Sequence, residues 1–179
     1  MMITGVQLIE YLLKEYGPLP QKKLQKLAYL AEIEYIKKHG ERLSDLSFKR
    51  YHYGPYSEDI RNIEDLEDNI IIAENHSNGY ASKESRLLNS VGAEPIESVE
   101  LSEEIDSFIA RYVNSTGAEL EKIADNTEPF LETENLNEPI DLDSFAWFYG
   151  IVNSDEFWKK AEMKDRENQE KGAYGKVLI

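Results

Sequence analysis

The chain of 179 residues contains no cysteine, which excludes structural disulfides, thiolate zinc sites and cysteine nucleophiles and fits a cytoplasmic protein. Long hydrophobic runs are also lacking. The longest, from Phe145 to Val152, falls far short of the roughly 20 apolar residues that a membrane-spanning helix needs. Near the start, Gln7, Glu10 and Lys14 interrupt the apolar pattern and no basic leader precedes it, so we expect a helix there and no signal peptide. The sequence therefore predicts no membrane association.

Basic residues are scarce. The chain has 20 Lys and Arg against 35 Asp and Glu, and its formal net charge is −15. Nucleic-acid affinity comes mostly from basic side chains that neutralise phosphates, so this charge argues against nucleic acid as a partner. The acidic residues lie mainly between Glu64 and Asp143, and they form either a solvated face or a surface that steers a basic protein partner.

Common catalytic and cofactor motifs are absent as well. The ten glycines form neither GxGxxG nor GxxxxGKS/T, so nucleotide binding by those loops is excluded. His39, His52 and His76 lack metal-binding spacing, and no GxSxG elbow or recognisable nucleophile and base pair occurs. We therefore predict no cofactor, no metal site, no catalytic residue and a protein that is not an enzyme.

Apolar spacing predicts two helices at the start of the chain. The first runs from a Thr4 cap to Tyr16, and the break GPLP leads to a second helix, with Pro20 in its first turn and Gly40 at its end. Two rows of apolar residues widen the buried face of the second helix: Leu24, Leu27, Ala28, Ala31 and Tyr35, and Tyr29, Leu30, Ile33 and Ile36. Such a helix contacts neighbours on two sides, so we expect it to be the central helix of the fold.

The segment after this helix alternates in polarity. Ser47 to Tyr53 has the period of a short strand, and Gly54-Pro55 is expected to break it. Ser57, followed by two carboxylates, predicts the N-cap of a helix that reaches about Leu66.

A small antiparallel sheet is predicted next. Ile70 to Ala73 indicates a buried strand, and the turn-rich stretch from Asn75 to Gly79 folds the chain back. The third strand is either Tyr80 to Ala81 or Arg86 to Leu88, and the sequence leaves this choice open.

The remaining chain is mainly helical. A helix begins near Leu101 with Ser102 as its cap, a second runs from Thr116 to about Asp125, and Thr127 to Asp141 is expected to be an irregular loop. A charged helix from Ser154 to about Lys171 closes the pattern. The predicted fold class is α+β and mainly α-helical, with a helical core and a small antiparallel β-sheet.

The C-terminal part contains a dense aromatic cluster. Its members are expected to form the last layer of the core, with an exposed docking patch as the alternative: Trp147, Phe148, Tyr149, Phe157 and Trp158. The final AYGKVLI is either a loose end or a strand that joins a sheet edge. We expect one domain over residues 1–135 and a helical extension over 136–179 packed on it.

Two blocks of sequence carry a resemblance. KLQKLAYLAEIEYIKKHGERL, from Lys23 to Leu43, followed by F-x-x-x-x-Y-G-P-Y-S, from Phe48 to Ser57, resembles the phage-associated Panacea domain family, also called SocA-like antitoxins. Further on, Leu101-Ser102-Glu103 and the stretch from Thr116 to Pro129 are similar to the family pattern, in which a histidine usually stands at the position of Asp125.

The resemblance implies a small, mainly helical prokaryotic protein without catalytic activity. Many such proteins are antitoxins that bind and neutralise a cognate toxin encoded next to them, and one type also delivers its toxin to a protease as an adaptor. Two alternatives remain open. The GPLP break and the lysines after it favour a helix-turn-helix-like transcriptional regulator, and the polar aromatics around Gly54-Pro55 favour an enzyme of unknown class.

Most residues of the matching blocks have a place in the core, so the less buried edge is left for contact with a partner. We predict the partner-binding site there, at the helix start and around Gly54-Pro55: Lys22, Lys26, Tyr51, Tyr53, Tyr56 and Ser57.

Overall fold

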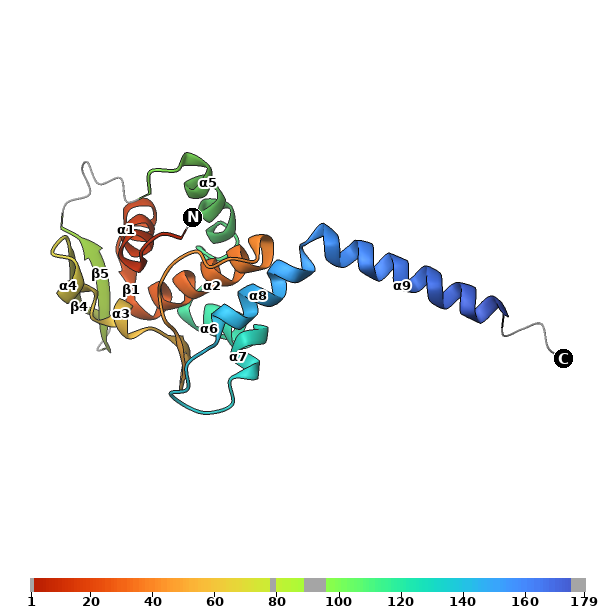
Figure 1. Ribbon diagram of the computed structural model, residues 1–179. Helices are drawn as coiled ribbons and strands as arrows, with labels where there is room; N and C mark the ends of the chain where they lie inside the picture. The colour runs from red at the N-terminus through yellow and green to blue at the C-terminus, as the bar shows by residue number, and fades with distance from the viewer. Residues whose placement is uncertain (1, 78–79, 89–95, 175–179) are drawn as a thin grey trace.

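The computed structural model describes residues 2–77, 80–88 and 96–174 (Figure 1). Within these residues the chain is mainly helical and contains two small antiparallel sheets, which confirms the predicted α+β class.

Two helices open the chain as predicted. α1 (Gly5–Tyr16) is capped by Thr4, which forms a reciprocal capping box with Gln7. α2 (Gln21–His39) lies at the centre of the molecule, with α1, α5, α6 and α8 packed around it (Figure 1). Twelve of its residues are buried, which confirms the prediction of a central helix with two apolar sides.

A β-hairpin follows α2. β2 (Lys49–Tyr51) pairs with β3 (Gly54–Tyr56), so the prediction that Gly54-Pro55 ends the strand region was wrong. Gly54 has φ of 85°, a value that glycine adopts without strain. This allows the chain to reverse direction between β2 and β3. The predicted helix to Leu66 is present as two short helices, α3 (Glu58–Arg61) and α4 (Ile63–Leu66).

The larger sheet has the strand order β1-β5-β4. β4 (Ile70–Ser77) pairs with β5 (Tyr80–Leu87), and the turn between them falls on residues 78–79, outside the described residues. Both stretches proposed for the third strand belong wholly or largely to β5. The third member is instead β1 (Leu19–Pro20), which lies in the break between α1 and α2.

Three helices come next in the chain, and the first two of them pack on α2. α5 (Val99–Ile109) is capped by Ser98 and not by Ser102. α6 (Gly117–Asp125) agrees with the predicted helix, and Thr116 is its N-cap. α7 (Glu128–Glu132) interrupts the segment that was predicted to be an irregular loop, because a proline in its first turn favours a helix start.

α8 (Leu142–Val152) packs directly on the end of α2. The backbones of Gly40 and Gly150 meet there, since a Cβ placed on Gly40 would lie 2.3 Å from the Cα of Gly150. The side-chain amide of Asn153 donates hydrogen bonds to the carbonyls of Lys37 and Lys38, at 3.0 and 3.2 Å, and so satisfies the last turn of α2.

α9 (Asp155–Tyr174) extends away from the rest of the molecule (Figure 1). The end of the AYGKVLI tail, from residue 175, lies outside the described residues. The aromatic cluster is not the core layer that we expected. Trp147 is 70% exposed and Trp158 is 56% exposed, and Phe148 and Phe157 are also exposed, whereas Phe145 is buried.

Candidate partner-binding site

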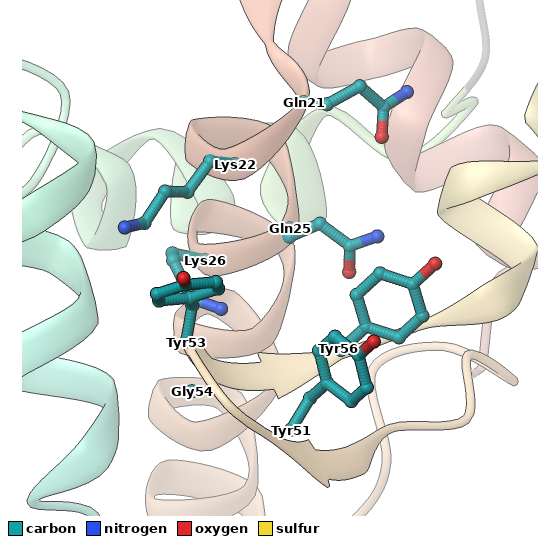
Figure 2. Close-up of a pocket in the computed structure, with 8 residues that line it drawn as sticks. All are labelled: Gln21, Lys22, Gln25, Lys26, Tyr51, Tyr53, Gly54 and Tyr56. Carbon is teal, nitrogen blue, oxygen red and sulfur yellow. The ribbon is translucent and has the colours of Figure 1, made fainter. Parts of the chain in front are cut away.

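Five of the six predicted contact residues line one pocket of about 220 Å³ (Figure 2). The pocket lies between the first two turns of α2 and the hairpin of β2 and β3. Its lining consists of the predicted Lys22, Lys26, Tyr51, Tyr53 and Tyr56, together with Gln21, Gln25 and Gly54. The two glutamines were not predicted, although they share one helix face with the two lysines because residues at i and i+4 lie above one another.

Gln25 and Lys26 hold the hairpin against α2. The buried amide of Gln25 accepts a hydrogen bond from the Ser57 N–H at 2.7 Å and donates one to the Ser57 carbonyl at 2.8 Å. Next to it, the Lys26 Nζ donates to the Pro55 carbonyl at 2.6 Å. Buried backbone groups need such partners, and here two side chains of a helix replace the neighbouring strand that β3 lacks on this side. The floor of the pocket is therefore fixed by hydrogen bonds.

The tyrosine rings form the accessible wall of the pocket. The ring centroids of Tyr51 and Tyr56 are 5.0 Å apart, and the Lys49 Nζ lies over both rings, at 5.7 and 5.4 Å. Tyr53 is 65% exposed, and the Lys22 Nζ lies 5.1 Å from the centre of its ring. Figure 2 shows Tyr53 beside the two lysines and the other two tyrosines beside Gln25.

The amines around these rings are already paired. Lys22 forms an ion pair with Glu121, Lys49 forms one with Glu58 at 2.6 Å, and Lys26 binds the Pro55 carbonyl. The pocket therefore offers aromatic surface more than free positive charge. Such a wall suits an apolar or aromatic side chain of a partner.

Lys26 and Asp125 form an electrostatic pair beneath Gly54. Burial lowers the pKa of Lys26 to about 8, and the nearby Asp125 and Glu121 oppose this effect. Burial and the Glu121 charge raise the pKa of Asp125, and Lys26 opposes them. Within the described residues, the Asp125 Oδ1 is buried without a hydrogen-bond partner. A Cβ on Gly54 would lie 2.6 Å from this oxygen, so the pair leaves room only for glycine at this position.

Ser57 is the one predicted residue that does not line the pocket. It is fully buried at the N-cap position of α3, but its hydroxyl makes no capping bond and has no hydrogen-bond partner in the described part of the chain. Its backbone anchors the hairpin through Gln25, and its side chain is not accessible to a partner.

Other residues of the matching blocks also hold the fold together. The Tyr29 hydroxyl hydrogen-bonds the Thr127 Oγ1 at 2.8 Å, and its ring packs edge-on against Phe48. The Lys23 Nζ donates to the carbonyl of Val113. The α2 block thus joins the hairpin, α6 and the segment after α5 into one core.

The fold and the pocket define a small, mainly helical α+β protein with an aromatic hollow beside its central helix. Over residues 24–129, more than half of the chain, the sequence matches the family described as antitoxin SocA-like, Panacea domain, and the chain belongs to this family. The match contains the pocket except Gln21 and Lys22, and it excludes α1, α8 and α9. No curated protein and no solved structure matches the chain.

Membership in this family supports an antitoxin-type role, and it favours a protein that is not an enzyme. None of the described helices is both long and apolar enough to cross a membrane. The described residues also contain no group of three or more His, Cys, Asp or Glu side chains placed to hold a metal ion.

Proposed function

We propose that this protein is a non-enzymatic antitoxin that neutralises a toxin by binding it at the tyrosine-lined pocket. The observation that carries the proposal is the convergence of Lys22, Lys26, Tyr51, Tyr53 and Tyr56 on one hollow, in or beside the segment that matches the antitoxin family. The cytoplasmic location and the protease-adaptor role that the resemblance implies stay predictions.

The chemistry of the pocket indicates the chemistry of the partner. The toxin inserts an apolar or aromatic side chain between the tyrosine rings, because the amines of the pocket are already paired. Around this anchor the toxin presents basic residues, since the antitoxin carries a net charge of −15 and exposes Glu58 at the rim. Opposite charges raise the association rate more than they raise the affinity, so binding is expected to be fast and sensitive to salt.

The geometry gives the regulator alternative little support. A recognition helix must present one face to the major groove of DNA, whereas α2 is buried on most of its surface. The lysines that suggested DNA contact have partners within the chain: the exposed Lys22 pairs with Glu121, Lys23 donates to the Val113 carbonyl and the buried Lys26 donates to the Pro55 carbonyl.

The pocket is compatible with the enzyme alternative, but the residues that line it include no catalytic pair. The eight lining residues are glutamine, lysine, tyrosine and glycine, and none of the polar side chains among them forms a nucleophile and base pair. His52 is exposed and packs against the Tyr51 ring at 5.2 Å, outside the lining.

Growth rescue tests the proposal. Each open reading frame next to the gene is expressed from an inducible promoter, alone and together with this protein. We expect one of them to arrest growth alone, to be neutralised by this protein and to co-purify with it. If no neighbour is neutralised and none co-purifies, the antitoxin proposal fails.

A pair of equally exposed residues then tests the pocket. Tyr53→Ala should weaken toxin binding by about 30-fold, the effect of losing an aromatic anchor, and should abolish rescue at low expression. Val99→Ala is the matched control, because Val99 is also 65% exposed but lies at the start of α5, away from the pocket lining. Equal affinities of the two variants for the toxin would remove the pocket from the binding site.

A further inference from the structure

α8 has two apolar faces, and only one of them is covered. Phe145 and Ala146 are buried against the core. Trp147, Phe148 and Ile151 lie on the other side of the helix and are 70%, 54% and 36% exposed. A surface helix normally has one apolar stripe, so the second face indicates a contact that one chain does not provide.

The exposed aromatics continue past the turn into α9. Phe157 and Trp158 stand in its first turn, with ring centroids 5.4 Å apart, and they are 39% and 56% exposed. We call the five side chains Trp147, Phe148, Ile151, Phe157 and Trp158 the elbow surface. Together they expose about 500 Å² if each aromatic side chain has about 200 to 250 Å² to bury, and a patch of that size usually marks an interaction site.

The elbow surface is separate from the proposed toxin site. None of its residues lines the pocket, and all of them lie outside the segment that matches the family. α9 extends about 30 Å at 1.5 Å per residue and leaves the body of the protein (Figure 1). A helix without tertiary packing is marginally stable in water, so this arm gains stability when its apolar side is covered.

We propose that the elbow surface binds the elbow surface of a second copy of this chain about a two-fold axis. The same patch then meets itself, as in the commonest class of homodimer. Two copies bury up to about 1,000 Å² in total, the lower limit for a contact between proteins, so a weak dimer is expected.

The charge distribution favours a second copy over a basic partner. The sequence of α9 has six acidic and five basic residues, so it contributes −1 to the net charge of −15. Two such arms therefore repel each other little, and salt weakens the remaining repulsion between the exposed charges. A basic toxin has no electrostatic reason to prefer this nearly neutral region to the acidic body.

Sedimentation equilibrium of the full chain tests the dimer. Between about 1 and 500 µM, the range expected for a contact of this size, the mass should rise from 20.7 kDa towards twice that value. Trp147→Glu and Trp158→Glu each remove one indole ring from both chains of the dimer. Each substitution should therefore weaken dimerisation by at least about 100-fold. Met163→Glu is the control, because Met163 is 63% exposed on a different face of α9 and should leave dimerisation unchanged.

Circular dichroism of the variants separates lost folding from lost association. The proposal is overturned if the mass of the wild type stays at 20.7 kDa at all concentrations. It is also overturned if Met163→Glu weakens dimerisation as strongly as the tryptophan substitutions do. If the wild type is a monomer and the tryptophan variants lose toxin rescue, the elbow surface belongs to the toxin. The proposed dimerisation does not depend on the pocket, so Tyr53→Ala should leave the dimer intact.

Discussion

Replacing Gln25 with leucine should detach the hairpin from α2 while a side chain of similar size stays in place. Gln25 is 4% exposed, and its amide satisfies both the N–H and the carbonyl of Ser57. Leucine fills much of the same volume but offers neither a donor nor an acceptor. The Ser57 N–H then has no partner among the described residues, whereas the Ser57 carbonyl loses one of its two bonds and keeps the one from the Arg61 N–H at 3.3 Å.

The cost follows from those two groups. A buried donor without a partner costs about 1 to 3 kcal/mol and the lost bond to the carbonyl about 1 kcal/mol, so the free energy of unfolding should fall by about 3 kcal/mol. With a urea m-value of about 2 kcal/mol/M, the unfolding midpoint should fall by about 1.5 M. Tyr56, which precedes Ser57, should lose its fixed place in the pocket wall, so toxin binding should weaken as well.

Gln21→Leu is the matched control. Gln21 has the same side chain, lies one turn earlier on α2 and donates to the Ser85 hydroxyl at 2.7 Å. Gln21 itself is half-buried and the buried Ser85 hydroxyl loses one partner, so the loss should be about 1 kcal/mol, clearly less than for Gln25. If urea titrations give the two variants the same midpoint, the hydrogen bonds of Gln25 do not hold the hairpin in place.

Two further substitutions test the electrostatics and the backbone of the core. The pKa of Lys26 is about 8 in the folded protein and about 10.4 in the unfolded chain. Between these pH values the unfolded chain binds more protons, so the free energy of unfolding should rise by about 2 kcal/mol from pH 8 to 9.5. Lys26→Met should abolish that rise in urea midpoints, and an unchanged slope would show that Lys26 is not its source. Gly40→Ala should cost at least about 3 kcal/mol, because it adds contact with Gly150 to a left-handed φ of 67°. Gly17→Ala, with φ of 77°, ψ of −165° and no atom within 4 Å, should cost about 2 kcal/mol from backbone strain alone, and a thermal shift as large as that of Gly40→Ala would contradict the contact.

The helices with local signals were predictable from the sequence. Thr4 caps α1 as expected, α6 begins directly after Thr116, and Gly40 ends α2 in the left-handed conformation that its position suggested. Each signal acts within a few residues of the chain, so no knowledge of the tertiary fold is needed to interpret it.

The strand pairing and the exposure of the aromatic cluster could not be predicted, because they depend on contacts between residues far apart in the sequence. β1 has two residues and exists because Leu19 and Pro20 lie opposite Ser85 and Glu84. The exposure of Trp147 follows from which face of α8 meets α2, and apolar spacing does not distinguish a core face from an uncovered one.

The candidate site was predictable in part for the same reason. The lysines on one face of α2 and the tyrosines around Gly54-Pro55 could be grouped from their spacing, and the structure brings them to one pocket. The role of Gln25 could not be inferred, because its partner Ser57 is 32 residues away in the sequence. Ser57 looked like an exposed cap, and only its burial shows that its side chain faces no partner.

The hydrogen bonds that attach the hairpin to α2 end on backbone carbonyl and amide groups of Pro55 and Ser57. They do not involve the side chains of Tyr51 and Tyr53, which stand on the rim. The rim residues can therefore be exchanged by point substitution while the hairpin keeps its position. A hairpin that is attached through its backbone allows the same fold to bind new targets during evolution without changes in its core.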